Sequence, residues 1–263
     1  MHYKPVSWTA NKSGSKAIFL LILLLLSGCN TSARHPPIAL TIPGVILYYP
    51  FNGNANDLST SHNNGQVHGA TLTLDRFGVR KHAYEFNGVD NDITFDASKV
   101  PLGPSPRTIS AWIKAESFPP ESNPIGSRAT VIGWGLSDWD QLSEMQIVSG
   151  RLVFHIYGQK EAYSKTVLEL NQWYHLAIVY TDGKVSLYVN GVEEDFEVSP
   201  VDTPIGDTGR IGAYPDPHKT GGMFPHGYDL SYFHGAIDDI SVYNQALTAG
   251  QIMALYTEGG WGK

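Results

Sequence analysis

Three oxygen-bearing side chains lie within six residues in the first quarter of the sequence. Asn52, Asn54 and Asp57 flank Gly53, which permits a tight bend. Ca²⁺ binds about six to eight oxygen atoms from carboxylates, amides and backbone carbonyls, so this spacing indicates a structural calcium site. The same residue types also stabilise turns through their own side chains, and the residues alone leave that alternative open.

Aromatic and polar side chains gather in two later segments, one around Trp139 and one over residues 214–234. Sugars present apolar C–H faces and polar rims, so exposed rings next to hydrogen-bonding groups predict a sugar-binding site. The expected ligand-binding residues are Trp139, Tyr214, His218, His226 and Tyr228. The alternative is that these rings pack on the protein itself. We expect such packing for Trp112, Trp134 and Trp173, which lie in strand-like runs.

The loop over residues 214–234 also combines acids and histidines. Zinc ligands usually come in pairs separated by about three to five residues, whereas seven residues separate His218 from His226. We therefore interpret these histidines as polar loop residues rather than as a metal or catalytic cluster.

Acidic residues do not form a recognisable catalytic pair. Retaining glycosidases need two carboxyl groups about 5 to 5.5 Å apart, which alternating acids on one strand face would provide. Glu193, Asp195 and Glu197 alternate, but we expect Phe196 and Val198 to point inward, which leaves the acids on a solvated face. No nucleophile elbow, phosphate loop or dinucleotide fingerprint occurs either. The sequence thus predicts a protein that is not an enzyme.

The N-terminal segment has the features of a signal peptide. Residues 1–28 carry three Lys and no acid, and an apolar run extends from Ala17 to Leu26. That run is shorter than the roughly 20 residues of a spanning helix. Leu26-Ser27-Gly28-Cys29 resembles the bacterial lipobox and contains the only Cys of the chain. The resemblance implies cleavage before Cys29, acylation with chains such as palmitate, and, because Asn30 follows, sorting to the outer membrane.

Loss of the signal peptide makes the protein more acidic. The formal net charge of the whole chain is −7, and removal of three Lys brings it to about −10. Nucleic acid and anionic lipid are disfavoured as partners, because phosphate binding requires Lys and Arg. Neutral sugars and divalent cations remain compatible with this charge.

The elements that position these residues are predicted to be short antiparallel strands. Residues 29–44 contain Pro36, Pro37 and Pro43 and are expected to form a flexible tether, with a single domain over residues 45–263. Asp182-Gly183 and Asn190-Gly191 predict two-residue hairpin turns and hence a three-stranded meander over residues 173–198. Thr248 and Gln251 form the pattern of a capping box and predict a C-terminal helix.

Strand-like runs rich in β-branched and aromatic residues predict an all-β sandwich. The other expected strands are Val45–Phe51, Gln66–Leu74, Ala83–Phe86, Asp92–Phe95, Thr108–Ala115, Thr130–Gly135, Glu144–Val148, Arg151–Tyr157, Arg210–Ala213 and His234–Tyr243.

Several segments resemble, in order and spacing, a bacterial laminin G-like domain with the concanavalin A-like jelly-roll fold. The motifs include Tyr48-Tyr-Pro-Phe-Asn-Gly-Asn-Ala-Asn-Asp57, Asp75-Arg-Phe-Gly78, Ala83-Tyr-Glu-Phe-Asn-Gly-Val-Asp90, Thr108-Ile-Ser-Ala-Trp-Ile-Lys114 and Phe233-His-Gly-Ala-Ile-Asp-Asp-Ile-Ser-Val-Tyr243. The resemblance extends over residues 45–256 and implies a β-sandwich of two antiparallel sheets. One fold carries many functions, so the fold by itself does not assign one.

The resemblance also implies a calcium ion where the first and last strands meet. By that analogy Asp57 and Asp239 are the side-chain ligands, together with oxygens of the turn that contains Asn52 and Asn54. The resulting hypothesis is a lipid-anchored envelope domain that binds carbohydrate and holds a structural Ca²⁺. Two alternatives remain open: a protein adhesion module in an envelope assembly, and an orphan polysaccharide hydrolase or lyase.

Overall fold

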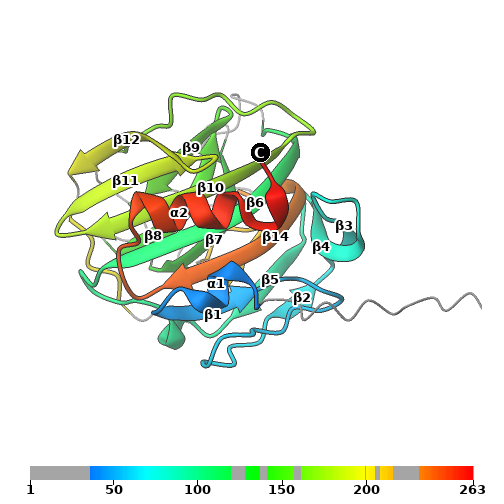
Figure 1. Cartoon of the computed structure of the whole chain (residues 1–263), viewed down its shortest axis with the longest axis horizontal. Helices are drawn as coiled ribbons and strands as arrows, with labels where there is room; N and C mark the ends of the chain where they lie inside the picture. Colours follow the sequence, from blue (N-terminus) through cyan, green and yellow to red (C-terminus); the bar gives the residue numbers. More distant parts are fainter. Residues whose placement is uncertain are drawn as a thin grey trace, which may run out of the picture. The chain divides into compact units, whose positions relative to one another are not determined.

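Two antiparallel sheets pack face to face and form the body of the protein (Figure 1). The computed structural model describes residues 36–119, 128–136, 141–156, 161–198, 200–204, 208–215 and 231–262. The predicted signal peptide and lipidation site at Cys29 lie outside these residues. The two-sheet jelly-roll sandwich predicted from the sequence is confirmed. No helix in the described part of the chain is both long and apolar enough to cross a membrane.

The larger sheet has eight strands, with β1 paired to β14 beside the main order. The order is β12 (Val192–Val198), β11 (Lys184–Val189), β10 (Trp173–Thr181), β6 (Arg107–Ser117), β14 (His234–Tyr243), β4 (Arg80–Asn87) and β3 (Thr71–Leu74), and β1 spans Val45–Tyr49.

The smaller sheet has six strands and carries the candidate site described below. Its order is β2 (Gln66–His68), β5 (Asp92–Phe95), β13 (Gly209–Ile211), β7 (Arg128–Gly135), β8 (Leu142–Val148) and β9 (Arg151–His155). The helical elements are α1 (Ile38–Thr41), η1 (Ala97–Lys99), α2 (Ala249–Tyr256) and η2 (Glu258–Gly260).

Two tight turns form the meander β10–β11–β12 as predicted. Type I′ turns need positive φ at both central residues. The first turn has φ of 50° at Asp182 and 75° at Gly183, and the second has 50° at Asn190 and 79° at Gly191. The predicted capping box is also present: the Thr248 side chain accepts from the Gln251 amide, and the Gln251 side chain accepts from the Thr248 amide. It begins α2.

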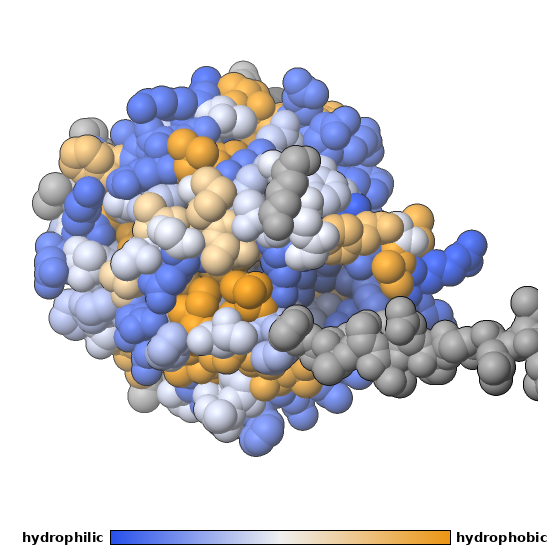
Figure 2. Space-filling model, in the orientation of Figure 1, coloured by the Kyte–Doolittle hydropathy of each residue, from blue (hydrophilic) through white to orange (hydrophobic). Residues whose placement is uncertain are grey.

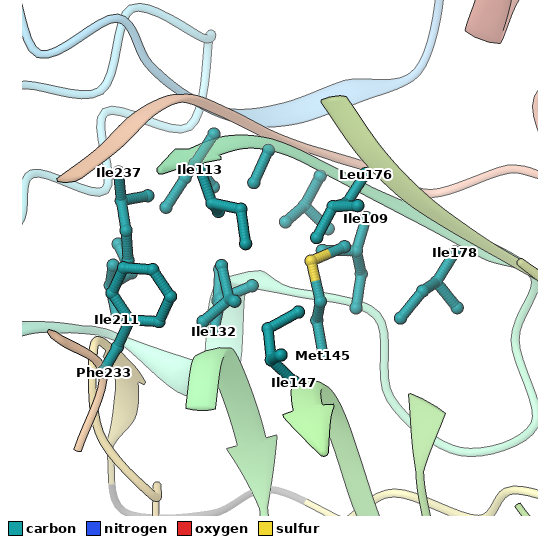
Figure 3. Packing of buried hydrophobic residues seen from close by; sticks show 14 of the residues in the cluster. Ile109, Ile113, Ile132, Met145, Ile147, Leu176, Ile178, Ile211, Phe233 and Ile237 are labelled. Atoms are coloured by element: carbon teal, nitrogen blue, oxygen red, sulfur yellow. The ribbon is translucent and has the colours of Figure 1, made fainter. Parts of the chain in front are cut away.

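The main hydrophobic core lies between the sheets (Figure 3). Branched aliphatic side chains of β6, β10 and β14 interdigitate with those of β7, β8 and β13, including Ile109, Ile113, Ile132, Ile147 and Ile237. Alternate residues of each strand point into this layer, so the residues between them point out of the sandwich. Trp134 is fully buried here, as expected, and donates to the Pro101 carbonyl at 2.9 Å.

A second apolar cluster lies on the outer face of the larger sheet, under α1 and α2. It contains Ala39, Ile42, Tyr48, Ala177, Val179, Tyr188, Tyr243, Leu247, Ile252 and Leu255. Figure 2 shows this side of the molecule, with apolar residues surfacing around the helices amid a hydrophilic surround. Within the segment predicted as a tether, Ala39 and Ile42 are buried in this cluster.

Candidate ligand-binding face

A polar cluster occupies the outer face of the six-stranded sheet. On β8, Met145 and Ile147 point into the core, so Glu144 and Gln146 point outward. The same alternation places Thr130 of β7 on that face. Polar side chains at the centre of a sheet are expected to have a structural or binding role, because burying them without partners is costly.

The strand registers align five residues in one row across this face. Arg210 on β13 pairs with Thr94 on one side and with Gly133 on the other. Gly133 pairs with Glu144, which pairs with His155. Gly133 contributes no side chain to the middle of the row, and neighbouring side chains occupy that space: a Cβ there would lie 3.0 Å from Cγ of Glu144 and 3.2 Å from Cγ of Pro215. The Glu144 side chain and Pro215 therefore pack directly against Gly133.

Glu144 is the most deeply buried group of the row and is only partly hydrogen-bonded. It has no exposed surface, and its Oε1 accepts from the Thr130 hydroxyl. Its Oε2 is buried and has no hydrogen-bond partner. Burial raises the pKa of the Glu144 carboxyl, because desolvation disfavours its charged form. An unpaired buried group of this kind costs about 1–3 kcal/mol.

A second carboxylate nearby is fully paired. Arg128 donates to Glu161 through two parallel bonds, Nη1 to Oε1 at 3.0 Å and Nη2 to Oε2 at 3.1 Å. His155 Nδ1 bonds Oε1, and the Tyr163 hydroxyl donates to Oε2 at 2.7 Å. Burial acts to raise the pKa of Glu161, but hydrogen bonds from His155 and Arg128 outweigh it and bring the pKa to about 2. Glu161 is therefore ionised at neutral pH.

The charges around Glu144 are compensated on both sides. Arg210 forms an ion pair with Asp92 at one end of the row, and Arg128 pairs with Glu161 near the other. Arg128 also donates to Gln146 Oε1 at 2.9 Å. Beside these pairs, Tyr163 keeps an exposed ring. The face therefore combines one unpaired carboxyl oxygen, paired charges and an exposed aromatic ring.

Sequence reasoning missed most of this face. Of the predicted ligand-binding residues, only Tyr214 is described. It is half-buried and directly precedes Pro215, which packs against Gly133. Trp139, His218, His226 and Tyr228 lie outside the described residues. A signal for Glu144 did exist, because Glu144 and Gln146 alternate with Met145 and Ile147 in an apolar strand.

The residues predicted to hold calcium are in a different place, on the loop after β1 and on β14. Asn52 and Asn54 are exposed, and Asn54 Oδ1 accepts from the Asn56 amide at 2.9 Å. Asp57 is buried and takes four protein hydrogen bonds. They come from the amides of Tyr48, Ser59 and Asn63 and from the Ser59 hydroxyl, each at 2.8 Å.

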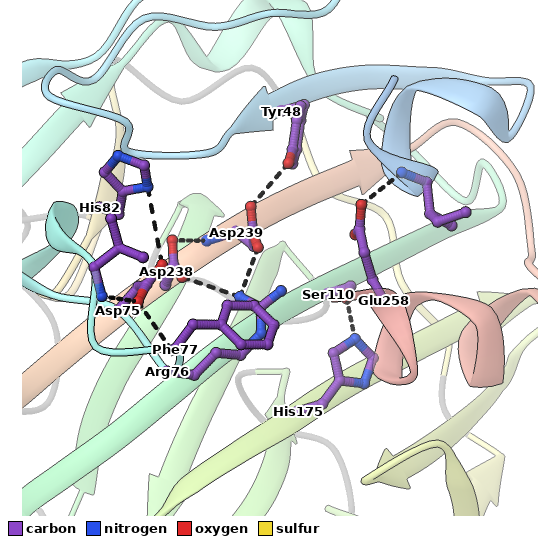
Figure 4. A network of polar contacts seen from close by, with 12 residues as sticks. Tyr48, Asp75, Arg76, Phe77, His82, Ser110, His175, Asp238, Asp239 and Glu258 are labelled. Carbon is purple, nitrogen blue, oxygen red and sulfur yellow. Dashed lines mark hydrogen bonds and ion pairs between the residues drawn. The ribbon is translucent and has the colours of Figure 1, made fainter. Parts of the chain in front are cut away.

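Asp239 is engaged differently, as Figure 4 shows. Its Oδ1 accepts from the Tyr48 hydroxyl at 2.8 Å, and its Oδ2 lies 2.7 Å from Arg76 Nη1. Asp57 contacts the backbone amide of the same Tyr48, so the two carboxylates lie at opposite ends of that residue. Among the described residues, no three or more His, Cys, Asp or Glu side chains are grouped to hold a metal ion. The arrangement does not fit a calcium ion held jointly by these four residues.

Solved structures with the same fold include binding domains of larger bacterial proteins. Domain 4 of a GH43 extracellular arabinanase from Geobacillus stearothermophilus, solved in complex with arabinotriose, is 20% identical with a TM-score of 0.60, covering 81% of this chain and 98% of that one. The binding domain of Paraclostridial Mosquitocidal Protein 1 is 16% identical with a TM-score of 0.61, covering 81% of this chain and 52% of that one. The botulinum neurotoxin serotype D binding domain is 16% identical with a TM-score of 0.56, covering 82% of this chain and 52% of that one.

At these identities the likeness establishes the fold alone, and the chain spans about half the length of the two toxin domains. No curated protein matches the sequence. A family model described as the concanavalin A-like lectin/glucanases superfamily matches residues 87–253, which is more than half of the chain. The protein therefore belongs to the concanavalin A-like lectin/glucanases superfamily.

Proposed function

We propose that this protein is a non-catalytic glycan-binding domain whose ligand lies on the outer face of the six-stranded sheet. The observation that carries the proposal is the buried Glu144 Oε2, which lacks a partner in the middle of a polar row. A sugar hydroxyl can both donate and accept hydrogen bonds, so it can pair with this oxygen whether the carboxyl is ionised or protonated.

The ligand expected from this chemistry is uncharged. Arg128 and Arg210 each form an ion pair with an acid, so the positive charge of each is already balanced on this face. The exposed ring of Tyr163 can stack on the C–H face of a sugar. The arabinotriose in the similar arabinanase domain supports a neutral sugar as the type of ligand.

A glycan-array screen of the purified protein tests the proposal. We expect selective binding to neutral oligosaccharides, with affinity reduced at least tenfold in Tyr163→Ala. Trp139→Ala and Tyr228→Ala test the two segments predicted from the sequence. Phe196→Ala is the matched control, because Phe196 is also an exposed aromatic residue but lies on β12, in the other sheet; it should bind like the parent.

Other outcomes would redirect the assignment. Silence of the folded protein across the array would contradict glycan binding and favour a protein partner in an envelope assembly. Binding accompanied by release of new reducing ends would indicate a hydrolase instead. Equal losses in Tyr163→Ala and Phe196→Ala would place the ligand away from the proposed face.

We also propose that Cys29 carries a lipid anchor and that the domain resides at the bacterial outer membrane. The lipobox-like residues 26–29 and the Asn at position 30 support this. Several acyl chains on one Cys give stable anchoring, since each buried methylene contributes about 0.8 kcal/mol. Labelling with a palmitate analogue should mark the protein and leave Cys29→Ala unlabelled. A parent protein that takes up no label would contradict the anchor.

A further inference from the structure

A buried arginine lies where the last strand changes its neighbour. β14 pairs with β4 through residues 234–237 and with β1 through residues 240–243. Between them its pairing with β6 also shifts register, and Asp239 has φ of 45°. This bulge directs the carboxylates of Asp238 and Asp239 to the outer side of the larger sheet, where both meet Arg76 (Figure 4).

The Arg76 side chain is buried between two carboxylates and two aromatic rings. Its Nη1 lies 3.0 Å from Asp238 Oδ2 and 2.7 Å from Asp239 Oδ2, and its side chain is 3% exposed. Its guanidinium also lies over two rings, 4.5 Å from the centre of Trp112 and 4.6 Å from that of Phe77. One cation thus bridges two carboxylates and contacts two aromatic faces, a combination that favours Arg over Lys.

The loop that carries Arg76 is itself held in place. Asp75 Oδ1 accepts from the amides of Phe77 at 2.9 Å and Val79 at 2.7 Å. Gly78 completes the turn with φ of 77°. The guanidinium is therefore supplied by a closed loop rather than by a mobile side chain reaching across the surface.

Several carboxyl groups surround Arg76. Asp238 lies among Asp239, Asp75 and Arg76, and Glu258 lies close enough to interact with both Asp239 and Arg76. Burial, followed by the Asp239 charge, raises the pKa of Asp238 well above its usual value. The fold at this junction therefore depends on Arg76, because its removal would leave buried charge uncompensated.

We infer that Arg76 is a built-in cation that takes the place of a metal ion at the junction of β14 with β1 and β4. It contacts β14 through Asp238 and Asp239. Asp239 contacts β1 through the Tyr48 hydroxyl. The junction therefore needs no Ca²⁺ in the native protein, and its carboxylates become available to a metal only when the guanidinium is lost.

Thermal melting of the purified protein in EDTA and in millimolar CaCl₂ tests the inference with three variants. The parent should melt at the same temperature in both buffers. Arg76→Met should melt lower in EDTA and recover part of the loss in CaCl₂, because its carboxylates are no longer neutralised. Arg76→Lys should lie between them and show no calcium response. Arg80→Met, which removes an exposed arginine four residues away, is the matched control and should behave like the parent.

A parent protein whose melting temperature rises in CaCl₂ would overturn the inference, since a metal would then already contribute to the native fold. An Arg76→Met variant as stable as Arg80→Met would also overturn it. If Arg76→Met does not fold, adding Asp239→Asn should restore folding, because it removes an uncompensated charge. If that double variant does not fold while Arg76→Lys melts like the parent, the proposed role of the Arg76 charge would be contradicted.

Discussion

At the scale of single residues, the two glutamates of the candidate face have opposite environments. Glu144 is buried with one unpaired oxygen, and its pKa is raised by burial. Glu161 is paired with Arg128, His155 and Tyr163, and its pKa falls to about 2. One carboxyl therefore keeps an oxygen without a hydrogen-bond partner, while the other is bonded through both oxygens.

This contrast predicts opposite pH dependence for two matched variants. Protonated Glu144 favours the folded state below the unfolded pKa near 4.5, and that contribution is lost as the pH rises through its raised folded pKa. Glu144→Gln mimics the protonated form. The free energy of unfolding of this variant should therefore be close to that of the parent at pH 4 and about 1–3 kcal/mol higher than that of the parent at pH 8.

Glu161→Gln is the paired variant with the opposite sign. A lowered pKa stabilises the fold above pH 4.5, and the contribution is lost as the pH falls towards about 2. Allowing for partial solvent screening, the variant should lose about 1–2 kcal/mol at pH 7 and approach the parent near pH 2. Urea unfolding across this pH range measures both variants. Parallel curves for parent and variants would contradict the two environments.

At the scale of elements, local signals in the sequence predicted the structure well. The turns at 182–183 and 190–191 and the capping box at Thr248 depend only on neighbouring residues, and each is confirmed. The predicted strand over residues 66–74 is instead two strands, β2 and β3, in different sheets. Gly69, with φ of 77°, separates them. Periodicity does not reveal which sheet a short strand joins.

The sequence prediction for the orientation of Phe196 in the meander is wrong, and only the strand pairing shows why. The register of β12 against β11 shifts where Leu187 pairs with Asp195 and Tyr188 with Glu193, so Glu194 of β12 has no residue opposite it. Phe196, expected to point inward, is 57% exposed, and the Lys184 ammonium lies 4.3 Å from its ring centre. A bulge reverses the faces of a strand without changing its composition, so the sequence pattern alone assigned the wrong side.

The candidate face was hidden from sequence analysis for a similar reason. Its central row takes one residue from each of β5, β13, β7, β8 and β9, and Gly133 contributes by lacking a side chain. No motif spacing encodes such a row, because its members are brought together by register. The residues predicted to bind calcium illustrate the reverse case: they form a plausible cluster in the sequence, but in the fold the carboxylates of Asp57 and Asp239 accept from protein donors.

At the scale of the whole molecule, the two outer faces differ. Both α-helices of the described chain, α1 and α2, lie on the larger sheet (Figure 1), where the second apolar cluster is buried. No described helix covers the polar row of the smaller sheet. The chain therefore uses the outer face of the larger sheet to close its fold, and the proposed ligand face belongs to the other sheet.

Closure of the fold joins the two ends of the described chain. The Ile38 amide donates to Glu258 Oε1 at 2.8 Å, and the Asn244 amide donates to the Gly44 carbonyl at 2.9 Å. A protein that begins at Val45 would lose the buried Ala39 and Ile42 and the hydrogen bond to Glu258. We expect its free energy of unfolding to fall by about 3 kcal/mol, since burial of one Ile side chain contributes about 1.5–3 kcal/mol.

Urea unfolding of three forms of the protein, beginning at Asn30, Pro36 and Val45, measures this contribution. The form beginning at Pro36 keeps Ala39 and Ile42 in the second apolar cluster and is the reference for the form beginning at Val45. The form beginning at Val45 should unfold at a lower urea concentration. Adding Glu258→Gln to that form should raise its urea midpoint again in part, because the substitution removes a buried carboxyl that has lost its hydrogen-bond donor. Equal midpoints for all three would mean that α1 rests on the sheet without stabilising it, and the domain would then begin at Val45.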